Sequence, residues 1–204
     1  MSMVTLVSGG LDSTLMAVFA KEEQLEQFPL FIDYGQRACK QEWLTCRQVL
    51  NKLRLPEPVR MDISGFGKTI PSGLTNIKLR LNEDAYLPGR NLLFLLVAGS
   101  FAYINNCSAI AIGLLNDKHH LFPDQTKAFL EKTEQLFATT FNRKIKIITP
   151  LMKFTKKDVV AMAKHKKISG TYSCHSGRKQ PCGKCISCLE FINSGINIGG
   201  NHGR

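Results

Sequence analysis

Val4-Thr5-Leu6-Val7-Ser8-Gly9-Gly10-Leu11-Asp12-Ser13-Thr14-Leu15 joins a short apolar run, a pair of glycines and a segment rich in hydroxyl side chains. This order predicts a buried strand, a tight turn and then a helix. Such a turn gathers backbone N–H groups and a helix N-terminus around one small volume, which suits a phosphate group. The two glycines let the backbone approach an anion, and Ser8, Ser13 and Thr14 offer hydroxyl donors. The spacing matches neither the Gly-Lys-Ser phosphate loop nor G-x-G-x-x-G.

Strand and helix patterns alternate along the rest of the chain. We expect strands near residues 4–7, 30–33, 59–63, 109–113 and 144–149, and helices over about 13–21, 39–53, 92–104, 126–141 and 155–165. This alternation predicts an α/β fold with a doubly wound parallel sheet and helices on both faces. Ligands bind such sheets beyond the C-terminal strand ends, where Ser8, Asp33 and Gly113 fall.

Two segments of this pattern carry further expectations. Residues 92–104 are apolar but too few to span a bilayer, and they predict a buried helix. The segment with Gly65, Gly67, Pro71 and Gly73 predicts an irregular loop that could cover a bound nucleotide as a lid.

Four cysteines near the C-terminus form the second motif, Cys174 followed by Cys182-Gly-Lys-Cys185-Ile-Ser-Cys188. C-x2-C spacing presents two sulfurs to one ion, and four thiolates suit tetrahedral Zn²⁺. An iron–sulfur cluster would accept the same four cysteines. His175 adjoins a ligand and is expected to be either a bystander or a group that supports the ligands without binding the metal. The remaining cysteines are scattered, with Cys107 expected in the core, so a disulfide framework is not predicted.

Four further motifs follow in order along the chain. They are Phe31-Ile-Asp-Tyr-Gly-Gln-Arg37, Pro88-Gly-Arg-Asn91, Phe122-Pro-Asp124, and Tyr172-Ser-Cys174 with Pro181-Cys-Gly-Lys-Cys185. With them, the Ser8–Ser13 loop resembles the Ser-Gly-Gly-x-Asp-Ser loop of ATP pyrophosphatases. Nearly end to end, the chain resembles the 7-cyano-7-deazaguanine synthase (QueC-like) family of that superfamily.

The resemblance implies an adenine-nucleotide α-hydrolase-like, Rossmann-like fold. It divides the chain into an ATP pyrophosphatase-type domain over residues 1–168 and a zinc-binding segment over 169–204, whose tail from Asn193 is expected to fray. It also implies a homodimer.

The implied reaction is an ATP-dependent carbon–nitrogen ligation. The family adenylates 7-carboxy-7-deazaguanine, amidates it with ammonia and dehydrates the amide to the nitrile, 7-cyano-7-deazaguanine. AMP and pyrophosphate are released, and Mg²⁺ accompanies the phosphates. A carboxylate is a poor electrophile, and adenylation gives it AMP as a leaving group.

Residue roles follow from the same resemblance. The implied catalytic residues are Ser8, Asp12, Ser13 and Arg90. The implied nucleotide-binding residues are Val7, Ser8, Gly9, Gly10, Leu11, Asp12, Ser13, Thr14, Arg90 and Asn91. The implied substrate-binding residues are Tyr34, Gln36, Phe122 and Asp124, and the implied zinc ligands are Cys174, Cys182, Cys185 and Cys188. For Arg90 an ordinary salt bridge is the alternative, and for Asp33 the choice is a strand-end cap or a ligand contact.

One segment departs from the family pattern. Where the family has Ser-Gly-Tyr-Pro-Asp-Cys-Arg, this chain has His120-Leu-Phe-Pro-Asp-Gln-Thr126, and Ala38 replaces a usual histidine. An alternative therefore stays open, in which a QueC-like enzyme of antiphage defence adenylates the deazaguanine acid and joins it to an amine of a partner protein. His119 and His120 are either solvated or transfer protons in that step.

Charge is distributed unevenly along the chain. The formal net charge is +11, and residues 143–184 hold 12 of the 27 basic residues with a single acid, Asp158. This basic stretch suits ATP, an acidic protein or RNA, or is only a solvated surface. No aromatic-rich RNA-binding module accompanies it, so no nucleic-acid substrate is expected. Without a visible targeting or membrane segment, we expect a cytoplasmic location and no membrane partner.

Overall fold

A parallel sheet forms the centre of the molecule. The computed structural model describes residues 1–115 and 122–196, and within them five strands pair in the order β3-β2-β1-β4-β5. The strands are β1 (Ser2–Leu6), β2 (Glu26–Asp33), β3 (Val59–Asp62), β4 (Ala109–Ala111) and β5 (Lys146–Ile148), and every pairing is parallel. The order runs outward from β1 in both directions, which confirms the predicted doubly wound α/β fold.

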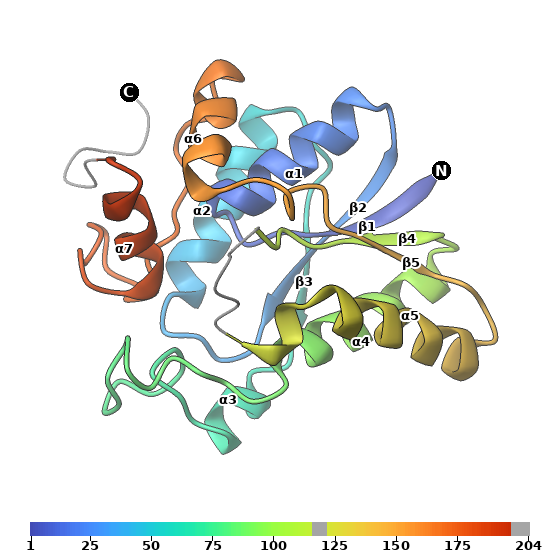
Figure 1. Cartoon of the computed structure of the whole chain (residues 1–204), viewed down its shortest axis with the longest axis horizontal. Helices are drawn as coiled ribbons and strands as arrows, with labels where there is room; N and C mark the ends of the chain where they lie inside the picture. The colour runs from blue at the N-terminus through green and yellow to red at the C-terminus, as the bar shows by residue number, and fades with distance from the viewer. Residues whose placement is uncertain (116–121, 197–204) are drawn as a thin grey trace.

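Helices cover both faces of the sheet (Figure 1). One layer holds α1 (Leu11–Glu22), α2 (Cys39–Lys52), α6 (Lys156–His165) and α7 (Ile186–Asn193), and the other holds α4 (Arg90–Ile104) and α5 (Lys127–Phe141). β1 alternates its side chains between two cores, with Met3 on the α1 side and Val4 and Leu6 on the α4 side. Two buried faces explain why this strand is apolar at consecutive positions.

The structure corrects several expected boundaries. β2 begins at Glu26, several residues before the expected start. α7 begins directly after Cys185 and contains Cys188, in a segment for which the sequence predicts no helix. The segment predicted to be irregular contains a short helix, α3 (Gly65–Thr69). A 3₁₀ turn, η1 (Pro123–Gln125), precedes α5.

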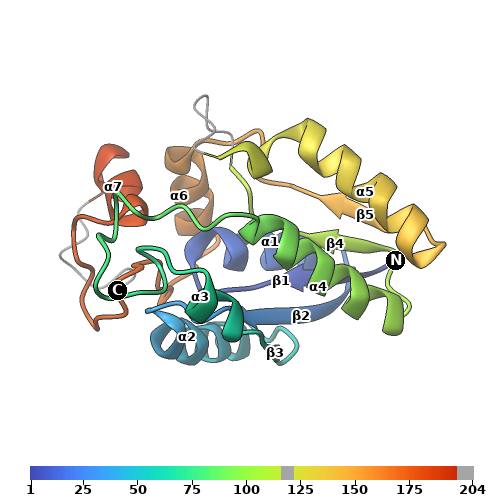
Figure 2. The same ribbon diagram turned by 90° about the horizontal axis from the view of Figure 1, so that it is seen from below.

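Residues 92–104 are helical as predicted, but the helix is buried on one side only. Leu92, Leu96 and Ile104 of α4 are 41%, 46% and 76% exposed, whereas Leu95 and Ala98 are fully buried. The helix lies in an outer layer beside α5 (Figure 2). The sheet covers one side of it, and Phe137 and Phe141 of α5 pack against Gly99, so the rest of its surface stays exposed.

Residues 70–89 form an irregular segment that packs on the turn after β2. The Arg37 N–H donates to the Leu74 carbonyl at 2.8 Å, and Arg37 Nη1 donates to the Gly73 carbonyl at 3.1 Å. This places the segment beside the end of the sheet that carries the predicted site, and its role as a lid stays a prediction.

The C-terminal part returns to the N-terminal part. Phe191 of α7 lies in the same core as α1, and the Tyr172 N–H donates to the Gly9 carbonyl at 2.9 Å. The boundary at residues 168 and 169 stays a prediction. His119, His120 and most of the tail expected to fray lie outside the described residues. Within the described ranges, no helix combines the length and apolar character needed to cross a bilayer.

Candidate active site and metal centre

The loop between β1 and α1 is held against α2. Gly9 has φ +77°, a left-handed conformation that favours glycine. A Cβ on Gly9 would lie 2.6 Å from the backbone nitrogen of Cys46, so even a methyl group would not fit. The first of the two glycines is therefore required by the approach of α2.

Two serine hydroxyls brace this loop from within. Ser13 Oγ accepts from the Ser8 N–H at 3.1 Å and donates to the Gly10 carbonyl at 3.2 Å. Ser8 Oγ lies 3.2 Å from Ser13 Oγ and accepts from the Gly10 N–H at 3.3 Å. α1 begins after Gly10 with no side-chain cap, so its first turn directs backbone N–H groups toward an incoming anion.

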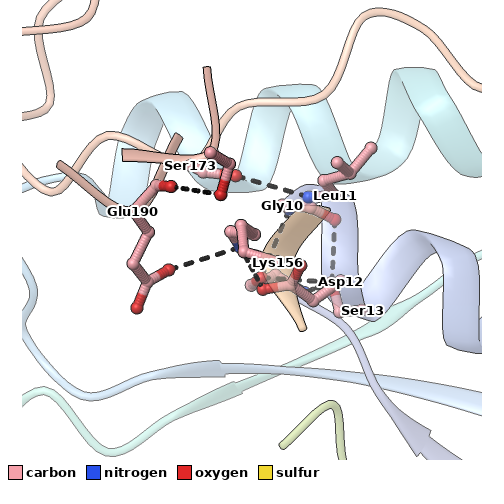
Figure 3. A network of polar contacts seen from close by, with 9 residues as sticks. Gly10, Leu11, Asp12, Ser13, Lys156, Ser173 and Glu190 are labelled. Atoms are coloured by element: carbon pink, nitrogen blue, oxygen red, sulfur yellow. Dashed lines mark hydrogen bonds and ion pairs between the residues drawn. The ribbon is translucent and has the colours of Figure 1, made fainter. Parts of the chain in front are cut away.

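A buried lysine neutralises the loop carboxylate. Lys156, the first residue of α6, donates to both carboxylate oxygens of Asp12 at 2.9 and 2.7 Å (Figure 3). Its Nζ also lies 3.3 Å from Glu190 and 4.7 Å from the centre of the Phe191 ring. The lysine side chain is 8% exposed. Burial alone would lower the pKa of Lys156, but the two carboxylates outweigh it and raise the pKa, so the ammonium stays charged.

The segment before the cysteines completes the loop from the other side. Ser173 Oγ accepts from the Leu11 N–H at 3.3 Å, and Figure 3 shows this serine beside Gly10. With the Tyr172–Gly9 bond, two consecutive C-terminal residues contact the backbone of the loop. The geometry of the loop therefore depends on residues more than 160 positions away.

A cleft opens beyond the strand ends and gathers most of the predicted residues. Those lining it are Val7, Ser8, Gly10, Asp12, Ser13, Tyr34, Gln36, Arg90 and Asn91. Gly113 also lines it, and a Cβ there would lie 3.4 Å from the Ser13 N–H, so the strand end approaches the loop closely. Gly9, Leu11 and Thr14 are all buried and are not among the residues that line the cleft.

Arg90 and Asn91 enter the cleft from the start of α4. Gly89 precedes them with φ +70°, which turns the chain into the helix. Asp124 Oδ2 accepts from the Asn91 N–H at 3.1 Å, and Asn91 Nδ2 donates to the Asp124 carbonyl at 3.1 Å. Asp124 thus anchors the N-terminus of this helix, which its position in the sequence did not indicate.

Phe122 and Asp124 lie apart from the other predicted substrate residues. They line a smaller depression next to the main cleft, which they share with Arg90. The Phe122 ring stacks on Tyr86, with the ring centres 5.0 Å apart. Arg90 borders both hollows, so it is the residue that joins the two groups.

The turn after β2 supplies the opposite wall of the cleft. Gln36 Oε1 accepts from the Tyr34 N–H at 2.9 Å, and Gln36 Nε2 donates to the Ile32 carbonyl and to Glu42. The Tyr34 ring packs on Phe94, 5.2 Å between centres. Burial raises the pKa of Tyr34 to about 12, with the positive charge of Arg90 acting in the other direction, so the phenol keeps its proton.

Asp33 is a strand-end cap in this structure. Its carboxylate accepts from the Gly35 N–H at 3.0 Å and from Arg60 at 2.6 Å. Asp33 is not among the residues that line the cleft. Of its two predicted roles, the geometry favours the structural one.

Three residues of the site were missed at the level of sequence. Lys156 lies between Thr155 and Asp158, which cap α6, and the sequence alone shows it only as one residue of the basic stretch. Glu42 lines the cleft from α2. His175 also lines it, although we expected a bystander or a support for the metal ligands, and its buried Nδ1 has no hydrogen-bond partner within the described residues. Burial lowers the pKa of His175 to about 4.

The four cysteines of the C-terminal motif come together. Their sulfurs lie within 4.8 Å of one another, and Cys174, Cys185 and Cys188 are buried. A hydrogen bond from Cys185 lowers the pKa of Cys174 to about 3. The Cys182 N–H also donates to Cys174 Sγ at 3.2 Å. Four sulfurs bound at about 2.3 Å around one ion lie about 3.8 Å apart, so the cluster fits a tetrahedral metal.

Comparison with known sequences agrees with the geometry. A family model described as "Queuosine biosynthesis protein QueC" matches residues 2–194. A 7-cyano-7-deazaguanine synthase of Campylobacter jejuni strain 81116 is 32% identical, and the alignment covers 95% of this chain and 93% of that protein. One from Prochlorococcus marinus subsp. pastoris is 35% identical, with 92% and 90% covered.

Solved structures share the fold at lower sequence identity. A predicted subunit of a tRNA methyltransferase from Methanocaldococcus jannaschii superposes with a TM-score of 0.56 at 22% identity, covering 84% of this chain and 82% of that chain. The U34-tRNA thiolase NcsA from Methanococcus maripaludis, solved with its [4Fe-4S] cluster, gives 0.55 at 15% identity over 95% of this chain and 64% of that one. The sequence match over nearly the whole chain, together with this fold, shows that the chain belongs to the QueC family.

Proposed function

We propose that this protein is an ATP-dependent, AMP-forming carbon–nitrogen ligase that converts 7-carboxy-7-deazaguanine into 7-cyano-7-deazaguanine. Its substrates are the deazaguanine acid, ATP and ammonia, and its site of action is the cytoplasm. The observation that carries the proposal is the braced Ser8–Ser13 loop at the end of β1, facing a cleft that holds Arg90. The relatives named above supply the substrate class.

In this proposal the loop binds the phosphates of ATP. Ser8, Ser13 and the N–H groups at the start of α1 contact the oxygens that gain charge as pyrophosphate leaves. Arg90 contacts the phosphates from the opposite side, since a guanidinium pairs well with charged oxygens. Mg²⁺ bound to ATP would neutralise further charge. Asp12 is the loop carboxylate that would hold it, by exchanging one of its two bonds to Lys156 for the ion.

The deazaguanine acid would occupy the wall formed after β2. Tyr34 and Phe94 offer aromatic surface to its ring, and Gln36 fixes the turn that presents Tyr34. We assign Phe122 and Asp124 to the outer part of the same site, next to Arg90. Adenylation requires the attacking carboxylate oxygen, the α-phosphorus and the leaving pyrophosphate oxygen to lie in line. Placing ATP on the loop and the acid on the wall after β2 favours this arrangement.

The four-cysteine cluster would hold Zn²⁺ in a closed, structural site. Four thiolates leave no position for water or substrate, so the ion stabilises the segment that contacts the loop. An iron–sulfur cluster is the competing occupant, and metal analysis with the visible absorption spectrum separates the two.

Mass spectrometry after incubation with ATP, Mg²⁺, the deazaguanine acid and ammonium tests the proposal. We expect AMP and the free nitrile to form together. AMP or a bound adenylate without the nitrile would favour acyl transfer to an amine of a partner protein, for which the relatives give no support. No AMP formed in the presence of the acid would refute the proposal.

A further inference from the structure

Two carboxyl groups line the cleft within the described residues, and they differ in whether a basic side chain pairs with them. Asp12 is bound through both oxygens by Lys156. Glu42 faces the cleft from α2 and has no basic partner in an ion pair within the described part of the chain. The Glu42 carboxylate is therefore an acid of the site to which the ATP chemistry assigns no role.

The position of Glu42 is fixed by its neighbours. Gln36 Nε2 donates to Glu42 Oε2 at 3.0 Å, and the same amide bonds to the Ile32 carbonyl and the Tyr34 N–H. The Glu42 N–H donates to the Ala38 carbonyl at 2.8 Å, in the first turn of α2. The other carboxylate oxygen, Oε1, has no hydrogen bond within the described residues, so it can accept one from a ligand.

The surroundings of Glu42 shift the pKa of its carboxyl group toward neutral pH. Burial is the largest effect and raises the pKa of Glu42 to about 7, while the amide of Gln36 and the charge of Arg90 from α4 lower it. Asp33 on β2 and the thiolate of Cys174 raise it. The other titratable side chains that line the cleft from neighbouring segments are Asp12, Tyr34, Tyr172 and His175.

We propose that Glu42 binds the incoming ammonium ion and removes its proton during amide formation. This inference rests on the proposed function and assigns it a further catalytic residue. Ammonium is the main form of ammonia at neutral pH, and it has no lone pair with which to attack a carbonyl. A fixed carboxylate beside the reaction centre both attracts the cation and accepts its proton.

The step balances as written. Ammonium transfers one proton to the Glu42 carboxylate and becomes ammonia. The nitrogen lone pair forms the C–N bond at the acyl carbon of the adenylate, and the C–O bond to the phosphate breaks to release AMP. The nitrogen then loses a second proton to solvent, which leaves the neutral amide, and the Glu42 carboxylic acid returns its proton to solvent before the next turnover.

Two nucleophiles separate proton removal from other roles. Hydroxylamine is neutral at pH 7.5 and attacks without losing a proton first, whereas ammonium must lose one. The experiment measures amide formation with ammonium and hydroxamate formation with hydroxylamine in wild-type protein and in Glu42→Gln. It also measures acid-dependent ATP–pyrophosphate exchange, which reports adenylation alone. The matched control is Glu57→Gln, a glutamate that is 73% exposed in its pair with Arg47.

For Glu42→Gln we expect amide formation to fall about 100-fold or more while exchange and hydroxamate formation stay within about threefold of wild type. Equal loss with both nucleophiles, or no loss with ammonium, would overturn the role of Glu42. Should Glu42→Gln not fold, Glu42→Asp keeps the acid on a shorter arm and is expected to lose more rate with ammonium than with hydroxylamine. Absence of exchange in wild-type protein would instead refute the proposed function itself, and this inference with it.

Discussion

Lys156 illustrates how one buried charge sets the state of the site. Its ammonium is shared between Asp12 on α1 and Glu190 on α7, so it neutralises the loop and ties it to the C-terminus. Removing one partner of a buried pair leaves the other charge uncompensated, which costs far more than the loss of a surface pair. Helix α1 takes part in both kinds of pair: the buried pair of Asp12 with Lys156 and the exposed pair of Glu22 with Lys166.

Asp12→Ala is expected to lower the rate of pyrophosphate release about 100-fold or more. The loop loses its carboxylate, and Lys156 loses its closest partner. Measurement of acid-dependent pyrophosphate release checks this. The matched control is Glu22→Ala at the other end of α1, which breaks an exposed pair with Lys166. This variant should change the rate less than twofold. Retained release in Asp12→Ala would remove this residue from the catalytic set.

Gly9→Ala is expected to destabilise the fold by about 1–3 kcal/mol, since it adds a backbone clash to an unfavourable φ. Gly195→Ala is the control, because Gly195 has φ +76° but no atom of the described residues within 4 Å of its Cβ position. Thermal unfolding compares the two variants, and at this chain length each kcal/mol corresponds to about 2–4 °C in Tm. If both variants lost the same amount, the contact with α2 would not be what requires the glycine.

Among the elements, β2 and β3 are joined by a charge pair between Asp33, the last residue of β2, and Arg60 of β3. Burial alone would raise the pKa of Asp33, but Arg60 and the Gly35 N–H outweigh it, so the pKa in the folded protein is lowered below the ordinary 3.8. A carboxyl group with a lowered folded pKa stabilises the fold above its unfolded pKa. That contribution is lost as the pH falls through the lower, folded value.

Asp33→Asn is therefore expected to be less stable than wild type at pH 7, by about 1–2 kcal/mol. The difference should shrink as the pH falls below about 4, because the wild-type carboxylate becomes protonated. Urea unfolding at several pH values measures both quantities. A difference that stayed constant down to pH 2.5 would show that the charge of Asp33 does not contribute.

The sequence predicted those elements whose cause is local. The apolar run, the glycines and the hydroxyl residues of Val4–Leu15 predict strand, turn and helix by themselves, and the cysteine spacing predicts one cluster. Lys156 could not be identified, because its role depends on contacts with Asp12 and Glu190 that only tertiary packing creates. The capping role of Asp124 on Asn91 and the position of Glu42 depend likewise on how helices meet at the sheet edge.

At the scale of the whole molecule, the four-cysteine cluster and the Ser8–Ser13 loop are held together by direct contacts. Tyr172 and Ser173, which directly precede Cys174, donate to and accept from the backbone of the loop. A well-ordered cysteine segment therefore helps to fix the conformation of the loop. A metal bound there would hold both, and its loss would loosen both.

Cys185→Ser is expected to reduce bound metal from about one ion per chain to nearly none, and to lower both the Tm and the affinity for ATP. Elemental analysis, thermal unfolding and nucleotide binding measure the three effects. Cys107→Ser is the control, since this buried thiol lies in the core on the α4 side, away from the cluster. Normal metal content in Cys185→Ser would refute the site.

The contacts between the loop and the C-terminal segment also determine when, during synthesis of the chain, the loop is completed. A ribosome makes the loop first and the residues that complete it, Ser173 and Glu190, near the end of the described chain. In a growing chain the backbone and charges of this loop thus lack their final partners. If the loop binds ATP as proposed, such a nascent chain would not consume ATP, because the contacts that complete the loop form only when α7 has been made.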